Sequence, residues 1–214
     1  MGSMSSLDQS DKRGQSDKRG QSDKSGQSGK SELTSLPNLL TLGRIAAIPI
    51  VVALLYLEGD LARWSAFGLY VAACFTDWLD GKIARARGEV SPFGRFLDPI
   101  ADKLLVTAII VMLVASGDLS GLHVVAAIII LCREMLVSGL REYLSELQMR
   151  LPVSKLAKWK TTVQMVALAI LLVGPAGPPE LALFGLLLFW LAAVLTVITG
   201  WDYLSRGLRH MLQQ

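Results

Sequence analysis

The sequence has few of the side chains from which proteins build disulfides, zinc sites and nucleophilic triads. Its 214 residues include two cysteines and two histidines. Both cysteines fall within predicted spanning helices, so no disulfide framework is implied, and the two histidines lie far apart in the sequence and do not indicate a metal site. Cys74 and Cys132 fall within apolar runs, where we expect each thiol to act as a small buried apolar group. No arrangement of Ser, Cys or His indicates a covalent intermediate.

Charge is also scarce outside the N-terminal segment. Charged residues make up 18% of the chain and hydrophobic residues 52%, although the first thirty-odd residues are strongly polar. The remainder is therefore more apolar than a soluble core requires. Several apolar runs reach the length of about 20 residues that a membrane-spanning helix needs. The composition predicts a polytopic membrane protein, and we expect no nucleic-acid partner.

The N-terminal segment, residues 1–35, contains a six-residue repeat. It reads QSDKRG, QSDKRG, QSDKSG and then QSGK, with no aromatic residue. A segment this polar cannot bury enough surface to fold, so we expect a disordered tail. The single domain then covers residues 36–214.

Six apolar segments separated by Gly and Pro predict an all-α fold with six transmembrane helices. Their expected ranges are 38–57, 62–86, 94–116, 122–147, 154–173 and 181–206. The connections after the first, third and fifth segments have only Arg63 among the basic residues, and the other Lys and Arg residues lie on the opposite side. Basic residues concentrate on the cytoplasmic side of a membrane. Both termini are therefore expected in the cytoplasm.

Four aspartates stand out at the cytoplasmic ends of the second and third predicted helices. Asp77 and Asp80 are three residues apart, and Asp98 and Asp102 are four apart, so each pair shares one helical face. An unpaired carboxylate at the centre of a membrane helix costs roughly 2.5–3.5 kcal/mol. A hard divalent cation such as Mg²⁺ or Mn²⁺ offsets that cost, and both ions prefer oxygen ligands. The four aspartates therefore predict a metal site, and a metal at a membrane face indicates phosphate chemistry.

Small residues follow the first pair of aspartates. Gly81 and Ala84 leave one side of the helix flat. Small residues commonly mediate helix packing in membranes. Beside an acidic cluster suited to metal binding, a site for a nucleotide phosphate is the better interpretation.

The stretch DWLDGKIARARGEVSPFGRFLDPIAD resembles the signature of the CDP-alcohol phosphatidyltransferase family. The matching residues are Asp77, Asp80, Gly81, Ala84, Arg85, Gly94, Asp98 and Asp102. The resemblance implies a six-helix membrane enzyme, usually a homodimer, that displaces CMP from a CDP-linked lipid with an alcohol. It also implies that the first three aspartates bind metal, with two ions expected, and that Asp102 both contributes to metal binding and acts as general base.

The resemblance extends to the nucleotide contacts. The run PNLLTLGR at residues 37–44 is similar to the family's first-helix contacts. The positions that the resemblance assigns to the CDP-lipid are Asn38, Thr41, Arg44, Gly81, Ala84, Arg85 and Ser91. For Arg44, which interrupts an apolar run, extension to the lipid headgroups is the alternative.

The rest of the chain is similar to the branch of the family that uses sn-glycerol 3-phosphate as acceptor. The stretches SPFGRFLDPIADKLLV, CREMLVSGLREYLSEL and KWKTTVQMVALA carry this similarity. The implied reaction joins sn-glycerol 3-phosphate to CDP-diacylglycerol, giving phosphatidylglycerol phosphate and CMP, at the inner (cytoplasmic) membrane of a bacterium. Acceptors such as inositol phosphate, serine or phosphatidylglycerol are alternatives that the motif does not separate.

An anionic acceptor needs a cationic pocket, for which the sequence offers Arg133, Arg141, Lys158 and Lys160. Arg133 falls inside an apolar helix, where a guanidinium requires a partner or a water-filled cavity. Its alternative role is an internal ion pair with Glu134 or Glu142, and the two lysines could instead extend to lipid headgroups.

The predicted chemistry is direct displacement. The acceptor's primary hydroxyl is a weak nucleophile, and Asp102, one turn beyond Asp98, is placed to take its proton. A cation transporter with aspartates at the membrane midplane is a rival interpretation. The aspartates lie towards one face and the helices show no internal repeat, which argues against a transporter.

Overall fold

The computed structural model describes residues 36–57, 59–87, 92–146 and 155–211, and the predicted N-terminal tail lies outside these ranges. Within them, every regular element is helical. The elements are α2 (Leu36–Tyr56), α3 (Asp60–Arg87), α4 (Pro92–Ala115), α5 (His123–Glu146), α6 (Lys155–Val173), the 3₁₀ turn η1 (Gly174–Ala176) and α7 (Pro179–Met211). Each predicted segment corresponds to one long helix, and the largest difference is at the end of α7, which extends five residues beyond the predicted 206.

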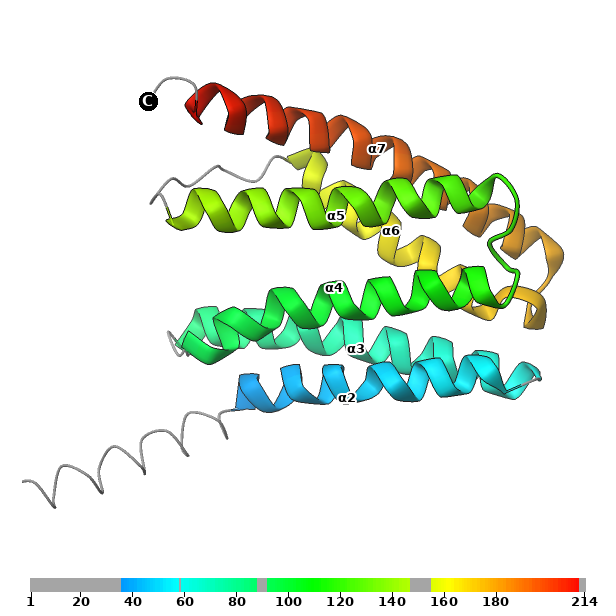
Figure 1. The fold of residues 1–214 in the computed structure, drawn as a ribbon. Helices are drawn as coiled ribbons and strands as arrows, with labels where there is room; N and C mark the ends of the chain where they lie inside the picture. Colours follow the sequence, from blue (N-terminus) through cyan, green and yellow to red (C-terminus); the bar gives the residue numbers. More distant parts are fainter. Residues whose placement is uncertain (1–35, 58, 88–91, 147–154, 212–214) are drawn as a thin grey trace, which may run out of the picture.

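The long helices run side by side along a common axis (Figure 1). Helix α2 packs on α3 and α4, and α7 packs on α5 and α6. Helix α6 also contacts α3 and α4, so it joins the two groups. The buried core includes Tyr70, Ile109 and Phe189.

Successive helices alternate in direction. The start of α2, the end of α3 and the end of α7 therefore lie at the same end of the bundle, on the left in Figure 1. We call this the motif end, because Asp77 and Asp98 lie near it. The α2–α3, α4–α5 and α6–α7 connections lie at the opposite end, which we call the far end.

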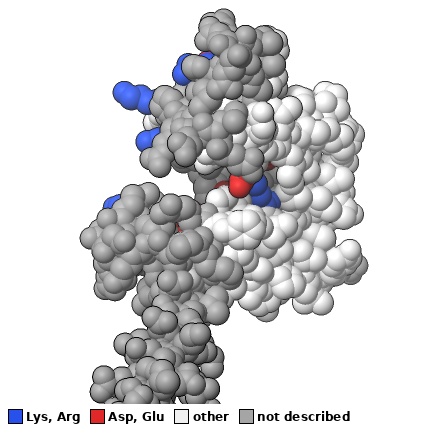
Figure 2. All heavy atoms as spheres, turned by 60° about the vertical axis from the view of Figure 1, so that its left-hand side comes forward, with Lys and Arg blue, Asp and Glu red and all other residues white. Residues whose placement is uncertain are grey.

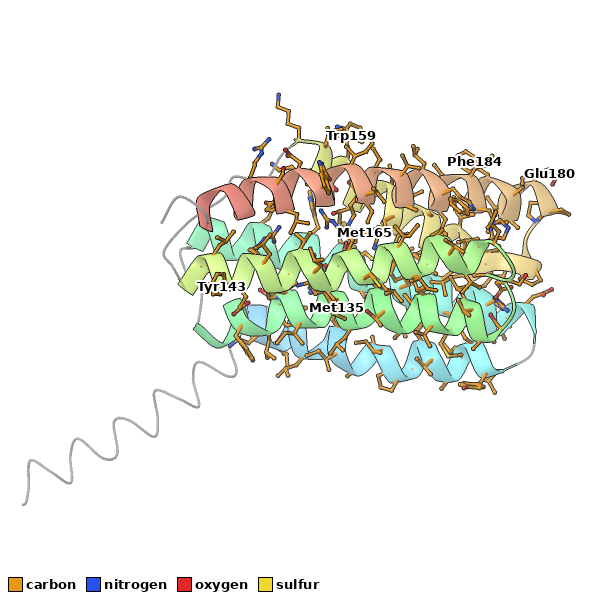
Figure 3. All side chains as sticks on the ribbon, turned by 45° about the horizontal axis from the view of Figure 1, so that its top comes forward. Met135, Tyr143, Trp159, Met165, Glu180 and Phe184 are labelled. Atoms are coloured by element: carbon orange, nitrogen blue, oxygen red, sulfur yellow. The ribbon has the colours of Figure 1, made fainter. Side chains whose placement is uncertain are left out.

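Within the described ranges, four helices are long and apolar enough to cross a membrane, which indicates a multi-pass membrane protein. The spans are Asn38–Tyr56, His123–Ser145, Lys155–Ala176 and Pro179–Gly207. Large apolar side chains cover the outside of the bundle; Trp159 and Phe184, labelled in Figure 3, are more than half exposed. The two remaining long helices, α3 and α4, carry the aspartates together with several basic residues.

The cysteine prediction was wrong for one of the two thiols. Cys74 is partly buried, whereas Cys132 is exposed on α5. Cys132 lies on the outer side of α5 with Ile128, Met135 and Leu136, which are at least half exposed, and an apolar outer surface is what a lipid-facing helix presents.

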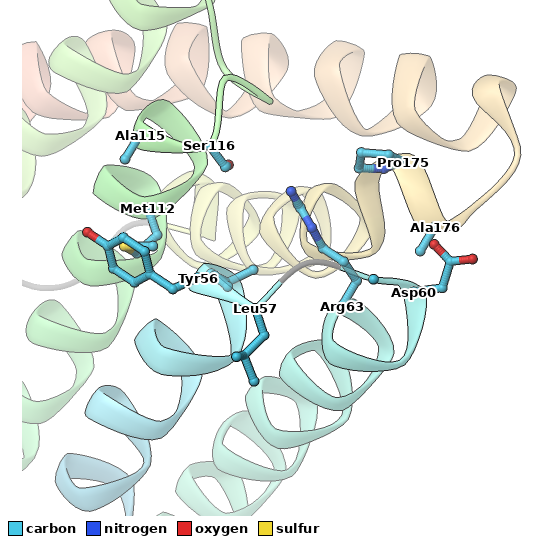
Figure 4. A pocket seen from close by; sticks show the side chains of 11 residues that line it. Tyr56, Leu57, Asp60, Arg63, Met112, Ala115, Ser116, Pro175 and Ala176 are labelled. Carbon is cyan, nitrogen blue, oxygen red and sulfur yellow. The ribbon is translucent and has the colours of Figure 1, made fainter.

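An ion pair between Arg63 and Asp118 lies at the far end. Arg63 Nη1 lies 2.6 Å from Asp118 Oδ2, and the Ser116 hydroxyl donates to the same oxygen at 2.5 Å. These contacts connect α3 to the turn that follows α4. A pocket of about 390 Å³ lies beside them, and Figure 4 shows Arg63 directed into it between Tyr56, Ser116 and Pro175.

Candidate active site

Helix α2 presents a buried polar face to the site. Asn38, Thr41 and Arg44 are spaced by three residues and are each at most 2% exposed. Three-residue spacing keeps the side chains on one side of a helix. Arg44 therefore does not extend to the headgroup surface, and the alternative role considered for it is not the one in the structure.

Two contacts connect this face to the aspartates. Arg44 Nη2 lies 2.7 Å from Asp77 Oδ1, and the Thr41 hydroxyl donates to Asp98 Oδ1 at 2.5 Å. Each contact joins α2 to a different helix of the aspartate motif. Because the pair Arg44–Asp77 combines opposite charges, it also lowers the cost of placing a carboxylate in an apolar helix.

Three of the four aspartates and the predicted acceptor cations share one cavity of about 540 Å³ at the motif end, between α3, α4, α5 and α6. Figure 2, which faces this end, shows acidic and basic atoms gathered in a hollow. The charged residues lining the cavity are Asp77, Asp98, Asp102, Lys103, Arg133, Glu134, Arg141, Lys158 and Lys160. Sequence reasoning placed these groups on four helices, and the fold brings them to a single volume.

The donor set suits a hard divalent cation. Asp77, Asp98 and Asp102 all line the cavity and offer only carboxylate oxygens, which Mg²⁺ and Mn²⁺ prefer. In the part of the chain that the structure describes, no three Asp, Glu, His or Cys side chains are gathered closely enough to form a complete metal site. The fourth predicted ligand, Asp80, is not included in that search, because its side chain lies outside the described residues.

Several other predicted contacts fall in the same undescribed part. The surroundings of Gly81, the side chains of Ala84 and Arg85, and the whole of Ser91 lie outside what the structure describes. Their assignment to the CDP-lipid stays a prediction.

Two of the cations are held by one carboxylate. Lys160, which is 3% exposed, contacts Glu134 Oε1 through its Nζ atom. Arg133 Nη1 lies 3.5 Å from the same oxygen. The ion pair considered for Arg133 as an alternative is therefore present, but at the edge of the contact range, and Arg133 still lines the cavity.

The remaining cations are more open. Lys158 is exposed and lines the cavity. The Arg141 guanidinium lies 5.7 Å from the centre of the Tyr203 ring, within the range of a cation–π contact. Lys103, which sequence reasoning did not assign to the pocket, also lines it, and its ammonium group donates to the Ser138 hydroxyl.

Helix α7 contributes contacts that the sequence did not reveal. Thr199 accepts a hydrogen bond from Arg133 Nη2 at 3.1 Å, and the next residue, Gly200, lies against the Arg133 side chain. The available signal was a pair of polar and small residues within an apolar spanning run. That signal does not say which helix the pair faces.

Comparison with known proteins gives consistent matches. The profile described as CDP-alcohol phosphatidyltransferase matches residues 34–198. Proteins named CDP-diacylglycerol--glycerol-3-phosphate 3-phosphatidyltransferase are similar over most of their length. The one from Rickettsia bellii is 48% identical, covering 79% of this chain and 93% of the relative. The one from Cereibacter sphaeroides is 37% identical, covering 83% and 97%.

A relative with a different name also matches. The rice (Oryza sativa) protein named cardiolipin synthase (CMP-forming) is 43% identical over 149 residues, covering 64% of this chain and 45% of the relative.

Proposed function

The chain belongs to the CDP-alcohol phosphatidyltransferase family and is an enzyme, and we propose that it transfers the phosphatidyl group of CDP-diacylglycerol to sn-glycerol 3-phosphate. The products are phosphatidylglycerol phosphate and CMP. The observation that carries this proposal is the shared cavity, in which the motif carboxylates face a group of Lys and Arg side chains. The carboxylates suit a metal-bound diphosphate, and the cations suit an acceptor that itself bears a phosphate.

The donor is proposed to bind at the α2–α3–α4 side of the cavity. Arg44 and Thr41 would orient Asp77 and Asp98, with Asn38 beside them on the buried face of α2. Asp77, Asp80, Asp98 and Asp102 would hold two Mg²⁺ or Mn²⁺ ions. When bound, such ions neutralise phosphate oxygens and stabilise the charge that develops on the leaving group.

The acceptor is proposed to bind with its phosphate between Arg133, Arg141, Lys158 and Lys160. Its free primary hydroxyl then lies towards Asp102. Asp102 takes the hydroxyl proton as the oxygen attacks the phosphorus that carries the diacylglycerol. The bond from that phosphorus to the CMP oxygen breaks, and CMP leaves with the electron pair. No protein nucleophile takes part.

We further propose that α3 and α4 also span the membrane, giving six spans with both termini and the cavity in the cytoplasm. The distribution of Lys and Arg supports this orientation. The location is then the inner membrane of a bacterium, and the family resemblance supports a homodimer.

The proposal predicts CMP release from CDP-diacylglycerol that requires sn-glycerol 3-phosphate and a divalent cation. Asp102→Asn keeps the shape of the side chain but removes the base, so we expect turnover to fall by about 10²–10⁴-fold. Asp202→Asn, the same change at an ion pair with Arg206 on α7, is the matched control and should keep wild-type turnover. Chelation with EDTA should abolish activity, and added Mg²⁺ or Mn²⁺ should restore it. Near-normal turnover by Asp102→Asn would show that another group is the base.

The similarity to a cardiolipin synthase makes phosphatidylglycerol the second candidate acceptor. Four acceptors offered separately with CDP-diacylglycerol distinguish the candidates: glycerol 3-phosphate, inositol phosphate, serine and phosphatidylglycerol. We expect the first to react fastest. A phosphate monoester carries more charge for the cations than the phosphodiester of phosphatidylglycerol, serine has no phosphate, and the names of the similar proteins favour glycerol 3-phosphate over inositol phosphate. Failure of glycerol 3-phosphate while another alcohol reacts would overturn the proposed acceptor.

A further inference from the structure

We propose that Thr199 of α7 is a positioning residue for the acceptor's phosphate, because it fixes the guanidinium of Arg133 on the cavity wall. The inference rests on the proposed function, in which Arg133 binds that phosphate. It assigns a role in acceptor recognition to the last helix, which contributes no residue to the aspartate motif.

The hydrogen bonds of Thr199 aim its oxygen at Arg133. The hydroxyl donates to the backbone carbonyl of Leu195 at 2.7 Å, one turn earlier in α7. A hydroxyl has one hydrogen and two lone pairs, so this bond leaves the oxygen free to accept. It accepts from Arg133 Nη2 at 3.1 Å. Thr199 is 2% exposed, so water does not compete for the contact.

The backbone of α7 at Gly200 also contacts the Arg133 side chain. A Cβ atom on Gly200 would lie 3.0 Å from Arg133 Cγ and 3.5 Å from its Nε. The arginine stem therefore lies directly against the helix at a position where a larger residue would displace it. Arg133 and this part of α7 are 66 residues apart in the sequence, and the contact exists only because α5 packs on α7.

The opposite end of the guanidinium faces Glu134. Its Nη1 atom lies 3.5 Å from Glu134 Oε1, so the two terminal nitrogens have different anchors on different helices. The Arg133 Nε atom is buried and has no hydrogen-bond partner among the described residues. Without the Thr199 oxygen, Glu134 remains as a partner for the guanidinium. We expect the guanidinium then to rotate towards Glu134 and away from the acceptor's phosphate.

The expected consequence is a selective loss of acceptor affinity. Thr199→Val removes the hydroxyl and keeps the shape. We expect the KM for sn-glycerol 3-phosphate to rise about tenfold, which is the size expected for losing one hydrogen bond to a charged group. The kcat value and the KM for CDP-diacylglycerol should stay within about twofold of the wild type, because the aspartate side of the cavity is unchanged. Thr199→Ser keeps the hydroxyl and should restore the acceptor KM.

Thr196→Val is the matched control. Thr196 lies one turn away on the same helix, is fully buried, and its hydroxyl has no hydrogen-bond partner within the described part of the chain. A general effect of removing a buried hydroxyl from α7 would appear equally in both valine variants. Equal acceptor KM values for Thr199→Val and Thr196→Val would overturn the inference, and so would a loss confined to kcat.

Gly200→Ala provides an independent test if Thr199→Val does not fold, as judged by its melting temperature and gel-filtration profile in detergent. The added methyl group should shift Arg133 and raise the acceptor KM without changing the donor KM. An unchanged acceptor KM in a folded Gly200→Ala enzyme would also overturn the inference. If the wild-type enzyme does not use sn-glycerol 3-phosphate at all, the proposed function fails instead, which separates the two outcomes.

Discussion

At the scale of residues, charged side chains of this site form ion pairs that join different helices. Arg44 of α2 meets Asp77 of α3, and Lys160 of α6 meets Glu134 of α5. A charged group in an apolar helix is costly without such a partner. Each pair therefore holds two helices together and also fixes a group that we assign to substrate binding.

The Arg44–Asp77 pair leads to the first residue-scale prediction. Arg44→Lys keeps the positive charge but replaces the planar guanidinium with a smaller ammonium group. The ammonium cannot reproduce the directed 2.7 Å contact with Asp77. We expect kcat/KM for CDP-diacylglycerol to fall at least about tenfold. Steady-state CMP release checks this. Arg206→Lys, the same change at an exposed ion pair with Asp202, should be silent, and equal values for the two variants would contradict the prediction.

The Lys160–Glu134 pair gives a second prediction, which separates stability from binding. Glu134→Gln leaves the buried Lys160 ammonium without its counter-charge, and breaking a buried pair from one side costs about 3 kcal/mol. We expect a lower melting temperature in detergent.

A double variant completes the experiment. Lys160→Met combined with Glu134→Gln removes both charges, so we expect most of the stability to return. The acceptor KM of the double variant should be above that of the wild type, because a cation of the pocket is missing. A wild-type acceptor KM together with a restored melting temperature would exclude Lys160 from phosphate binding.

At the scale of the elements, the far end of the bundle has an ion pair that we assign to stability alone. The Arg63–Asp118 pair joins α3 to the turn after α4, and η1 lies against it. Gly174, the first residue of η1, has a φ of +46° and approaches the pair closely: a Cβ there would lie 3.1 Å from Arg63 Nη1. The turn that reverses the chain into α7 therefore depends on a residue without a side chain.

Gly174→Ala should reduce stability without changing catalysis. The left-handed backbone costs an alanine about 1–2 kcal/mol, and the methyl group also presses on the ion pair. Gly117→Ala is the matched control, because Gly117 has a φ of +83° but no atom near its Cβ position. We expect the melting temperature to fall further for Gly174→Ala than for Gly117→Ala, with wild-type KM values in both. Equal melting temperatures would show that the ion pair adds nothing.

For the whole molecule, the proposed orientation places the two ends of the bundle on opposite sides of the membrane. Ser120 is exposed in the turn between α4 and α5 at the far end, and Ser145 is exposed near the motif end of α5. In a variant that lacks Cys74 and Cys132, a cysteine introduced by Ser120→Cys should react with a membrane-impermeant maleimide in intact cells. One introduced by Ser145→Cys should react only after permeabilisation. The reverse pattern would invert the topology.

The sequence could predict the elements because apolar runs, glycines and prolines are local signals. The predicted 94–116 segment and the observed α4, Pro92–Ala115, differ by two residues at most. The three-residue spacing of Asn38, Thr41 and Arg44 was also local, and the structure places all three on one buried face.

What the sequence could not predict depends on how the helices pack. The contact between Arg133 and Thr199 requires α5 and α7 to pack together. Nothing in the sequence around either residue indicates the other as its partner. Glu134 appeared only as a possible partner of its neighbour Arg133, whereas its closer contact is with Lys160, 26 residues away. The six predicted spans are tested only in part: among the described residues four long helices have the length and hydropathy of spans, and a membrane placement of α3 and α4 stays a prediction.

The uneven polarity of the helices has a consequence for how the protein is made. Helix α2 partitions into lipid readily, whereas α3 and α4 carry the charged motif and pack directly on α2. If α3 and α4 span the membrane as proposed, we expect α2 to assist their insertion, because it supplies Arg44 and Thr41 as partners for their aspartates. Loss of both the Arg44 and the Thr41 side chains should therefore reduce the amount of protein that escapes quality-control proteolysis, whereas Arg44→Lys keeps a cation beside Asp77 and can be assayed.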